Sequence, residues 1–478
     1  MARLRARKAA PDSEPHFKDY AARGLALHTM RRFDEALAAY DYGLRIAPND
    51  VELRNGRGVA LLELRRPAEA CDEFTRALDA DRDYLDALGN LGNALIKLNR
   101  PEEALAAYDR ALKIVPNNAE LLTNRAVVLR RLDRPQEALM SAARALAEKP
   151  GFAQARFVAS VARLTLGDFA AGWRGYEARW GVGALARQRR HFAASLWLGD
   201  APLAGKTILL HAEQGFGDTI QFVRYAPLVA ARGAKVVLEV QRALTPLCAG
   251  LPGVAEVVAH GDALPPFDCY CPLLSLPLAF GTEAATVPAD IPYLAPRADA
   301  VAAWRGRLPQ GRPLIGLCWS GERFHDNDLN RSMAVETLTP LLDLPDVQFV
   351  SLQHDVRETD ARLLAQRTDI LPIGQQFTDF ADTAAAIAAL DLVISVDTAV
   401  AHLTGALGKP LVLLLPFAAD FRWLRERSDS PWYPTARLFR QPRFADWTSV
   451  VEAVREEVKL FVCANPSSSY AGLTRVSC

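Results

Sequence analysis

Asp397, Thr398 and His402 form the pattern with the clearest chemical content in this sequence. They follow the apolar run 391–396, which predicts a buried strand followed by a helix. The first turn of a helix presents unpaired N–H groups and the positive end of a dipole, so it favours phosphate. Thr398 and His402 are four residues apart and therefore share one helix face. The pattern predicts a diphosphate site; the alternative is a plain N-cap at Asp397 and a packed surface histidine.

A second polar segment, CWSGERFHDNDLNRSM, covers residues 318–333 and follows another predicted strand. Its glycine, Ser320 and Arg331 suit a loop that folds over phosphates, because a guanidinium makes paired hydrogen bonds to them. Asp326 and Asp328 have the Asp-x-Asp spacing of some metal sites. Two carboxylates in a solvated loop are usually just solvated, so we predict no metal there.

The third segment is the turn Gly215-Phe216-Gly217-Asp218, between the apolar run 206–211 and a helical stretch. It lacks the third glycine of a dinucleotide-binding fingerprint, so it does not indicate NAD. One interpretation is a tight turn with Asp218 as the helix cap. The other is one wall of an active site in a cleft, with Asp218 as the general base.

The first third of the chain carries an internal repeat with a step of 34 residues, starting at Arg31, Arg65, Asn99 and Asp133. A small residue in each unit lets two antiparallel helices approach, an aromatic residue packs over it, and a proline ends the second helix. No unit can bury its apolar face alone, so the units must stack into a superhelix. The pattern resembles a tetratricopeptide repeat array over about residues 17–180. The recurring columns are Ala36, Ala70, Ala104 and Ala138, and Tyr40, Phe74 and Tyr108.

Asn90 and Asn124 occupy equivalent columns of this array, and Asn93 lies one turn beyond Asn90. An amide offers both a donor and an acceptor, so such side chains can hold the backbone of an extended peptide. The array resembles that of O-GlcNAc transferases, which carry an asparagine ladder, although the preceding repeat has Gly56 in this column. We predict an acceptor groove at these residues; the alternative is that they only bridge adjacent helices.

From about residue 200 onward, short apolar runs alternate with helical stretches, which predicts parallel sheets covered on both faces. We predict two Rossmann-like lobes with a cleft between them, so the fold class is an α-solenoid followed by an α/β GT-B pair. Ligands of such lobes bind at the carboxyl ends of the strands. The predicted strands are 206–211, 235–240, 255–260 and 267–271, then 312–320, 347–353, 391–396 and 410–416. The predicted segments are a disordered start (1–16), the repeats (17–180), a linker (181–200), the first lobe (201–296), a connection (297–311), the second lobe (312–460) and a disordered tail (461–478).

The totals of the sequence restrict the classes of partner. Lys and Arg (56) balance Asp and Glu (56), so composition gives no reason to expect nucleic-acid binding. No stretch reaches the roughly 18 apolar residues of a membrane span, and the basic start lacks the apolar core of a secretory signal. The cysteines show no disulfide or metal framework. We therefore expect a cytoplasmic protein.

The three motifs GFGD, WSG…NRS and SVDTAVAHL, each at a strand end, resemble glycosyltransferase family 9, the heptosyltransferase group, over about residues 190–460. The resemblance implies the GT-B fold, inversion at the sugar carbon without a metal or cofactor, and Asp218 as the general base. The junction with repeats is similar to bacterial relatives of O-GlcNAc transferase. The residues that would bind the nucleotide sugar are Gly215, Gly217, Ser320, Arg331, Asp397, Thr398 and His402.

The expected function is glycosyl transfer from a nucleotide-diphosphate sugar to a protein or peptide held by the repeats. One alternative acceptor is a cell-surface glycan or a lipid-linked sugar, and another reading is a repeat scaffold with an inactive transferase domain. The family's usual glycine after Asp-Thr is Ala399 here, which keeps the last reading open. Trp319, Trp423 and Trp432 could stack on a base or sugar, or belong to the core.

Overall fold

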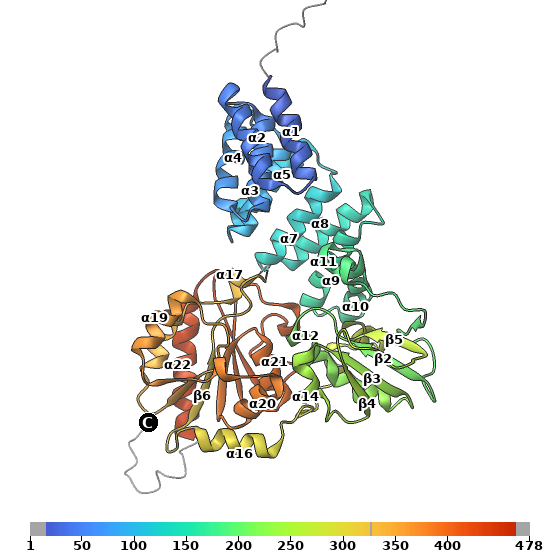
Figure 1. Ribbon diagram of the computed structural model, residues 1–478, viewed down its shortest axis with the longest axis vertical. Helices are drawn as coiled ribbons and strands as arrows, with labels where there is room; N and C mark the ends of the chain where they lie inside the picture. The colour runs from blue at the N-terminus through green and yellow to red at the C-terminus, as the bar shows by residue number, and fades with distance from the viewer. Residues whose placement is uncertain (1–15, 326, 465–478) are drawn as a thin grey trace, which may run out of the picture. The chain divides into compact units, whose positions relative to one another are not determined.

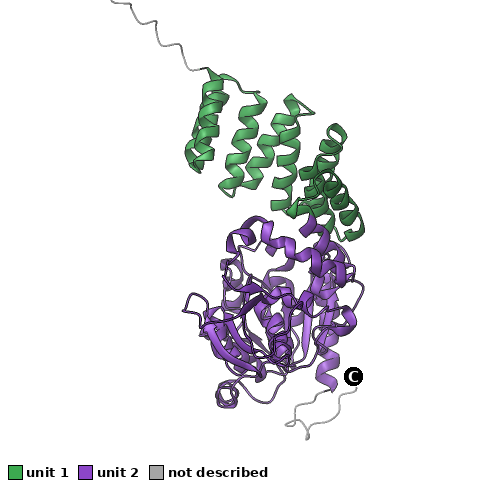
Figure 2. Ribbon diagram, turned by 90° about the vertical axis from the view of Figure 1, so that its right-hand side faces the viewer, with its two compact units in different colours: residues 1–155 green, residues 156–478 purple. Residues whose placement is uncertain are grey.

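The computed structural model describes residues 16–325 and 327–464, which divide into two compact units at residues 155/156 (Figure 2). The predicted disordered ends lie almost wholly outside the described residues, as does Asp326 of the predicted loop. Residues 461–464, which we predicted as tail, form the end of helix α22 (Trp447–Ala464).

The first unit is a row of antiparallel helix pairs (Figure 1). The first helix of each pair is stopped by a residue in the left-handed conformation, with φ between 52° and 61°, at the same 34-residue step. In three pairs the second helix then begins with proline, whose fixed φ suits the first helical position. The helices are α1 (Phe17–Thr29), α2 (Phe33–Ile46), α3 (Val51–Glu63), α4 (Pro67–Ala80), α5 (Leu85–Lys97), α6 (Pro101–Ile114), α7 (Ala119–Arg131) and α8 (Pro135–Glu148).

The aromatic residues of the repeats pack against glycines of the first helix of their pair, which the predicted alanine column did not include. The Tyr108 ring is fully buried against Gly92, and the Phe74 ring lies in the same way against Gly58. A β-carbon at either glycine would come within 2.5 Å of the ring, so the small residue sets the distance between the paired helices. The stacked helical repeat is confirmed.

The second unit contains two parallel sheets covered by helices (Figure 1). The first sheet has the order β1-β5-β2-β3-β4, and the second has the order β11-β10-β9-β6-β7-β8. Its strands are β1 (Ser195–Leu196), β2 (Thr207–His211), β3 (Lys235–Val240), β4 (Val254–Ala259), β5 (Cys269–Pro272), β6 (Leu314–Cys318), β7 (Gln348–Ser351), β8 (Ile370–Pro372), β9 (Leu392–Val396), β10 (Leu411–Leu415) and β11 (Ala436–Arg440). The sequence missed β1, β8 and β11, because the first two are very short and β11 carries two arginines instead of a continuous apolar run.

The structure differs from the predicted domain boundaries in two segments. Helices α9 (Ala153–Thr165) and α10 (Phe169–Tyr176) continue the repeat pattern in sequence, yet the second unit begins at residue 156 and contains α10. Trp173 and Tyr176 of α10 are buried in the core of that unit. Strand β1 lies in the predicted linker 181–200 and pairs with β5.

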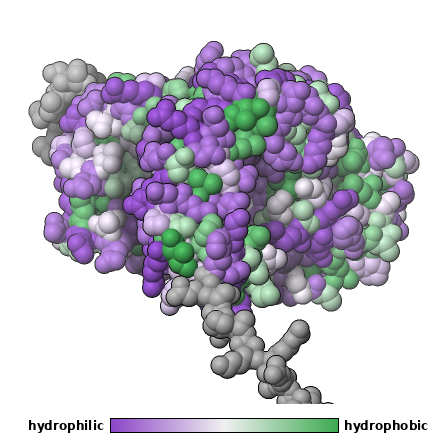
Figure 3. Space-filling model, turned by 90° about the horizontal axis from the view of Figure 1, so that it is seen from above, coloured by the Kyte–Doolittle hydropathy of each residue, from purple (hydrophilic) through white to green (hydrophobic). Residues whose placement is uncertain are grey.

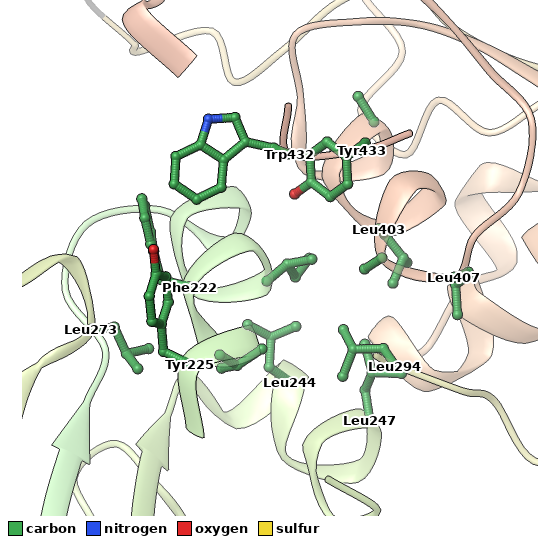
Figure 4. Packing of buried hydrophobic residues seen from close by; sticks show 14 of the residues in the cluster. Phe222, Tyr225, Leu244, Leu247, Leu273, Leu294, Leu403, Leu407, Trp432 and Tyr433 are labelled. Atoms are coloured by element: carbon green, nitrogen blue, oxygen red, sulfur yellow. The ribbon is translucent and has the colours of Figure 1, made fainter. Parts of the chain in front are cut away.

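The two lobes of the second unit share one hydrophobic core, which continues from one sheet to the other (Figure 4). Phe222 of the first lobe lies with its ring 5.7 Å from the ring of Trp432 of the second. Arg224 is buried between the lobes and donates to the backbone oxygens of Pro288 and Trp432. The two lobes are therefore in direct contact around Phe222, Arg224 and Trp432.

Across residues 16–325 and 327–464, no helix combines the length and the apolar character that crossing a membrane requires. The face seen in Figure 3 is mostly hydrophilic, with hydrophobic residues in small separate spots.

Candidate active site

The structure brings together the predicted residues from the ends of β6 and β9, which are neighbours in the second sheet. The Sγ atom of Cys318 lies 3.7 Å from Oγ1 of Thr398. Arg331, on the short helix α17 (Asp328–Arg331), donates from Nη1 to the backbone oxygen of Asp397 at 3.1 Å. Its guanidinium lies over the bare backbone of Gly321, where a β-carbon would come within 2.5 Å of Nη2. One polar edge is thus built from two segments far apart in the sequence.

Helix α21 (Ala399–Ala406) begins at this edge, and its N-cap is Thr398 rather than Asp397. The Thr398 side chain makes no capping hydrogen bond, and its Oγ1 instead lies 3.0 Å from Oγ of Ser395. The cap interpretation of Asp397 is therefore wrong. Because no side chain caps α21, its first-turn N–H groups remain suited to an anion.

His402 is buried beneath this edge instead of lying on the surface. Its Nδ1 is 3.0 Å from the Tyr433 hydroxyl, and its ring stacks on Trp423. Its Nε2 faces Asp397 Oδ1 at 3.6 Å, so a tautomer with the proton on Nε2 satisfies both contacts. Burial, helped by the Arg422 charge, lowers the pKa of His402 to about 3. The ring is neutral at pH 7, so it adds no positive charge for a phosphate.

Burial and the neighbouring charged groups shift the pKa of Asp397. Burial raises its pKa to about 6, the carboxylate of Asp420 adds to the shift, and Arg331 opposes it. A carboxyl group with this pKa exchanges its proton near neutral pH, which is a property of general bases.

The buried histidines predict a pH dependence of stability. Burial also lowers the pKa of His211 to about 4. The folded pKa values of His211 and His402 lie below the ordinary value of about 6.5, so the unfolded chain binds more protons as the pH falls through this range. The contribution of each neutral histidine is complete above pH 6.5 and is lost as the pH falls from 6.5 to the folded pKa, which is about 4 for His211 and about 3 for His402.

We expect urea unfolding to show this for His211 alone. Relative to His211→Gln, the wild type should lose about 2 kcal/mol of unfolding free energy between pH 7 and pH 5, from about 1.4 kcal/mol per pKa unit. The difference between the two proteins isolates the histidine from the carboxylates, including Asp397, whose raised pKa acts in the opposite direction. Parallel pH curves for the two proteins would contradict the assignment.

Two buried polar atoms at the site have no hydrogen-bond partner among the residues that the structure describes. They are Oγ of Ser320 and Nε of Arg331, and both point to a ligand or an ordered water at the ends of β6 and β9. Ser320 is itself 2% exposed, and its backbone is held by Gln353. Hydrogen bonds with Gln353 therefore hold the Ser320 backbone in place, while Ser320 Oγ and Arg331 Nε can donate to a ligand.

The GFGD turn opens helix α12 (Phe216–Phe222), whose N-cap is Gly215. Asp218 is the third residue of the helix, and its Oδ2 accepts the Gly215 N–H at 2.9 Å. Asp218 is thus not the cap itself, although it closes the first turn. The interpretation of Asp218 as the helix N-cap is wrong, because the N-cap lies three residues earlier, at Gly215.

Gly217 faces α21 directly. A β-carbon at Gly217 would lie 2.8 Å from Cδ2 of His402, so the absent side chain lets α12 and α21 touch. The predicted cleft is therefore closed at this point. The glycine serves close helix packing rather than an open wall, and the GFGD turn lies next to the edge formed by the ends of β6 and β9.

Arg422 joins this site and was missed from the sequence. It follows β10, donates from Nη2 to Asp218 Oδ1, and donates from Nε to Oε1 of Gln221 at 2.7 Å. Burial alone would lower its pKa, but the carboxylates of Asp420 and Asp218 outweigh burial and raise the pKa. Its position just after the strand beside β9 was the one available signal, because parallel strands end at the same edge.

The candidate stacking residues Trp319, Trp423 and Trp432 are all core residues, with at most 1% of their surface exposed. None presents a free face for a base or sugar. Trp423 instead covers His402, with the ring centroids 5.3 Å apart.

The predicted groove asparagines of the repeats are already engaged in part. Asn90 donates to Oδ1 of Asn55 at 2.9 Å, and Asn93 accepts from the Tyr108 hydroxyl at 2.7 Å. Both therefore bridge neighbouring helices, while Asn124 is half-buried on α7. Asn55 is a member that the column comparison missed, because that comparison placed Gly56 in register with Asn90.

Comparisons with known proteins agree with both parts of the chain. Models of the tetratricopeptide repeat match residues 21–84, 85–118 and 107–140. The model of glycosyltransferase family 9 (heptosyltransferase) matches residues 351–418. That segment contains Asp397, Thr398 and His402, but not Asp218 or Arg331.

Protein FlbA of Caulobacter vibrioides is 27% identical over an alignment of 337 residues that covers 65% of this chain and 56% of FlbA. The chain thus spans little more than half the length of this relative. Among solved structures, YrrB, described as a TPR protein with an unusual peptide-binding site, is 25% identical and covers 35% of this chain and 89% of its own, with a TM-score of 0.31. PilF of Pseudomonas aeruginosa is 18% identical and covers 37% and 78%, with a TM-score of 0.33. The chain joins tetratricopeptide repeats to an α/β domain that resembles glycosyltransferase family 9.

Proposed function

We propose that this chain is a glycosyltransferase that moves a sugar from a nucleotide-diphosphate donor to a protein or peptide acceptor. The observation that carries the proposal is the uncapped start of α21 beside two unpartnered buried donors, Ser320 Oγ and Arg331 Nε. A helix start, a hydroxyl and a guanidinium together suit the diphosphate of the donor. The family 9 match over residues 351–418 supports the same chemistry.

In the proposed reaction, an acceptor hydroxyl or amide attacks the anomeric carbon of the donor sugar. A bond forms from the acceptor to that carbon, the bond from that carbon to the diphosphate oxygen breaks, and the diphosphate leaves with the electron pair. Asp218 takes the acceptor proton as the general base. Fixed dipoles at α21 and the Arg331 charge stabilise the leaving diphosphate. A single displacement of this kind inverts the sugar carbon, and we propose no cofactor for it.

The repeats would recruit the acceptor. Tetratricopeptide repeats support protein binding, and the array offers amide groups at Asn55, Asn90 and Asn124. The bond between Asn90 and Asn55 uses only one of the N–H donors of Asn90, so the remaining donors and acceptors can meet a peptide backbone. The acceptor, the donor sugar and the cytoplasmic location stay predictions.

One observation favours the alternative of a scaffold with an inactive transferase domain. Both oxygens of Asp218 have partners in the structure, the Gly215 N–H and Arg422. A carboxylate held in this way must still offer a lone pair to the acceptor. Donor binding separates the two functions, because only the enzyme needs a nucleotide sugar.

We expect nucleoside diphosphates and nucleotide sugars to raise the unfolding temperature. A ligand at 100 times its Kd adds about 2.7 kcal/mol to the unfolding free energy by mass action. Arg331→Ala should remove most of that shift, because the guanidinium is then absent, whereas Arg323→Ala, on the same loop but paired with Asp355, should keep it. If no nucleotide changes the unfolding of the wild type, the scaffold reading is favoured over the enzyme.

A further inference from the structure

The inference concerns Arg422 and depends on the proposed function of Asp218. Arg422 lies in the second lobe, in the short helix η8 (Phe421–Trp423) that follows β10, and its side chain reaches across to α12 of the first lobe. Each of the three side-chain nitrogens of Arg422 donates to a different residue. Nε donates to Gln221, Nη1 to Asp420 and Nη2 to Asp218. A planar guanidinium held at three points has one orientation, and so does the carboxylate that it holds.

The low solvent exposure of Arg422 and Asp218 helps to hold the two side chains in this orientation. The Arg422 side chain is 9% exposed and that of Asp218 is 20% exposed, so the pair is shielded from competition by water. Gln221 is fully buried on the same helix as Asp218, one turn further on. The arginine therefore fixes Oδ1 of Asp218, while the Gly215 N–H fixes Oδ2.

Arg422 is poorly placed to bind a substrate itself. Each of its three nitrogens already donates to a protein oxygen, and the side chain is buried between α12 and the loop after β10. Any effect on the reaction must therefore pass through Asp218. This separates Arg422 from Arg331, whose Nε has no hydrogen-bond partner in the described part of the chain.

We propose that Arg422 is a positioning residue that holds the Asp218 carboxylate in the geometry needed to receive the acceptor proton. Because Arg422 and Asp218 lie on different lobes, the Asp218 carboxylate is held in this geometry only when the two lobes are packed against each other. The fork of a guanidinium is essential to this role, because a lysine ammonium supplies the charge but not three fixed donors.

The test uses the full chain and the variant Arg422→Lys. The matched control is Arg224→Lys, since Arg224 is also buried between the lobes but donates to backbone oxygens and tyrosine, not to Asp218. We expect Arg422→Lys to lower kcat at least tenfold with the donor KM changed less than twofold. Arg224→Lys should leave kcat within twofold of the wild type.

A double-mutant cycle separates positioning from general structural damage. In an Asp218→Asn background, Arg422→Lys should change the residual kcat less than twofold, because there is no base left to position. If Arg422→Lys does not fold, Gln221→Met removes the Nε anchor alone and should lower kcat in the same way. An unchanged kcat in the foldable variants overturns the inference, and so does an equal loss in both backgrounds. Lack of transfer by the wild type with every nucleotide sugar overturns the proposed function instead, and this is seen before any variant is made.

Discussion

Asp218→Asn is expected to lower kcat by about 10²- to 10⁴-fold, the usual contribution of a general base. The amide has the same shape, but it cannot receive the acceptor proton. It can still accept the Gly215 N–H through its oxygen, so the first turn of α12 stays closed. Donor binding should survive, because the groups assigned to the diphosphate lie at α21 and on Arg331. Transfer of a labelled sugar and a nucleotide-induced shift in unfolding temperature measure the two properties separately.

Two further variants make this result interpretable. Asp379→Asn is the matched control, because Asp379 caps helix α20 (Phe380–Ala388) and asparagine caps equally well, so activity should be unchanged. Asp397→Asn tests the other carboxyl group of the site, whose pKa burial raises to about 6. Full activity of Asp218→Asn with loss of activity in Asp397→Asn would move the base to Asp397.

The sequence predicted most of what depends on local pattern. The 34-residue step gave the repeat, and apolar runs followed by polar residues located the ends of β6 and β9 with Ser320, Arg331 and Thr398. These predictions succeed because parallel strands place their carboxyl ends at one edge. A motif at one strand end and a motif at its neighbour therefore meet without further information.

What the sequence missed depends on contacts between distant segments. The Asp218–Arg422 pair joins residues 204 positions apart, and nothing in the local pattern of either predicts the other. The same holds for Gly217, whose role is set by the His402 ring on another lobe. The closed packing of α12 on α21 was missed for this reason, since a glycine-rich turn looks the same whether it faces a ligand or a helix.

The boundary of the second unit leads to the prediction with the largest expected effect on folding. A chain that begins at residue 156 should fold and bind the donor, whereas a chain that begins at residue 182 should not fold. The second cut removes Phe169, Trp173 and Tyr176, which are at most 3% exposed. Trp173 and Tyr176 both lie within 6 Å, between ring centroids, of Phe421 in the second lobe. Each buried aromatic side chain contributes about 1.5–3 kcal/mol.

The same cut also removes Arg179, which is fully buried and pairs with Glu213 at 2.8 Å. Glu213 precedes the GFGD turn and would be left as a buried charge without its partner, at a cost of about 3–5 kcal/mol. Together with the lost aromatic residues, this approaches the whole stability of a domain, about 5–15 kcal/mol. Circular dichroism and urea unfolding of the two chains measure the difference directly.

A point variant separates the ion pair from the aromatic core. In the chain that begins at residue 156, Arg179→Met alone should lower the unfolding free energy by about 3–5 kcal/mol, and adding Glu213→Gln should recover part of that loss, because the buried charge is then gone. Cooperative unfolding of the chain that begins at residue 182, with the stability of the longer chain, would show that α10 is only an appendage of the repeats. The expected result makes α10 a structural part of the α/β unit, so that the last helix of the repeat pattern and the turn carrying Asp218 share one core.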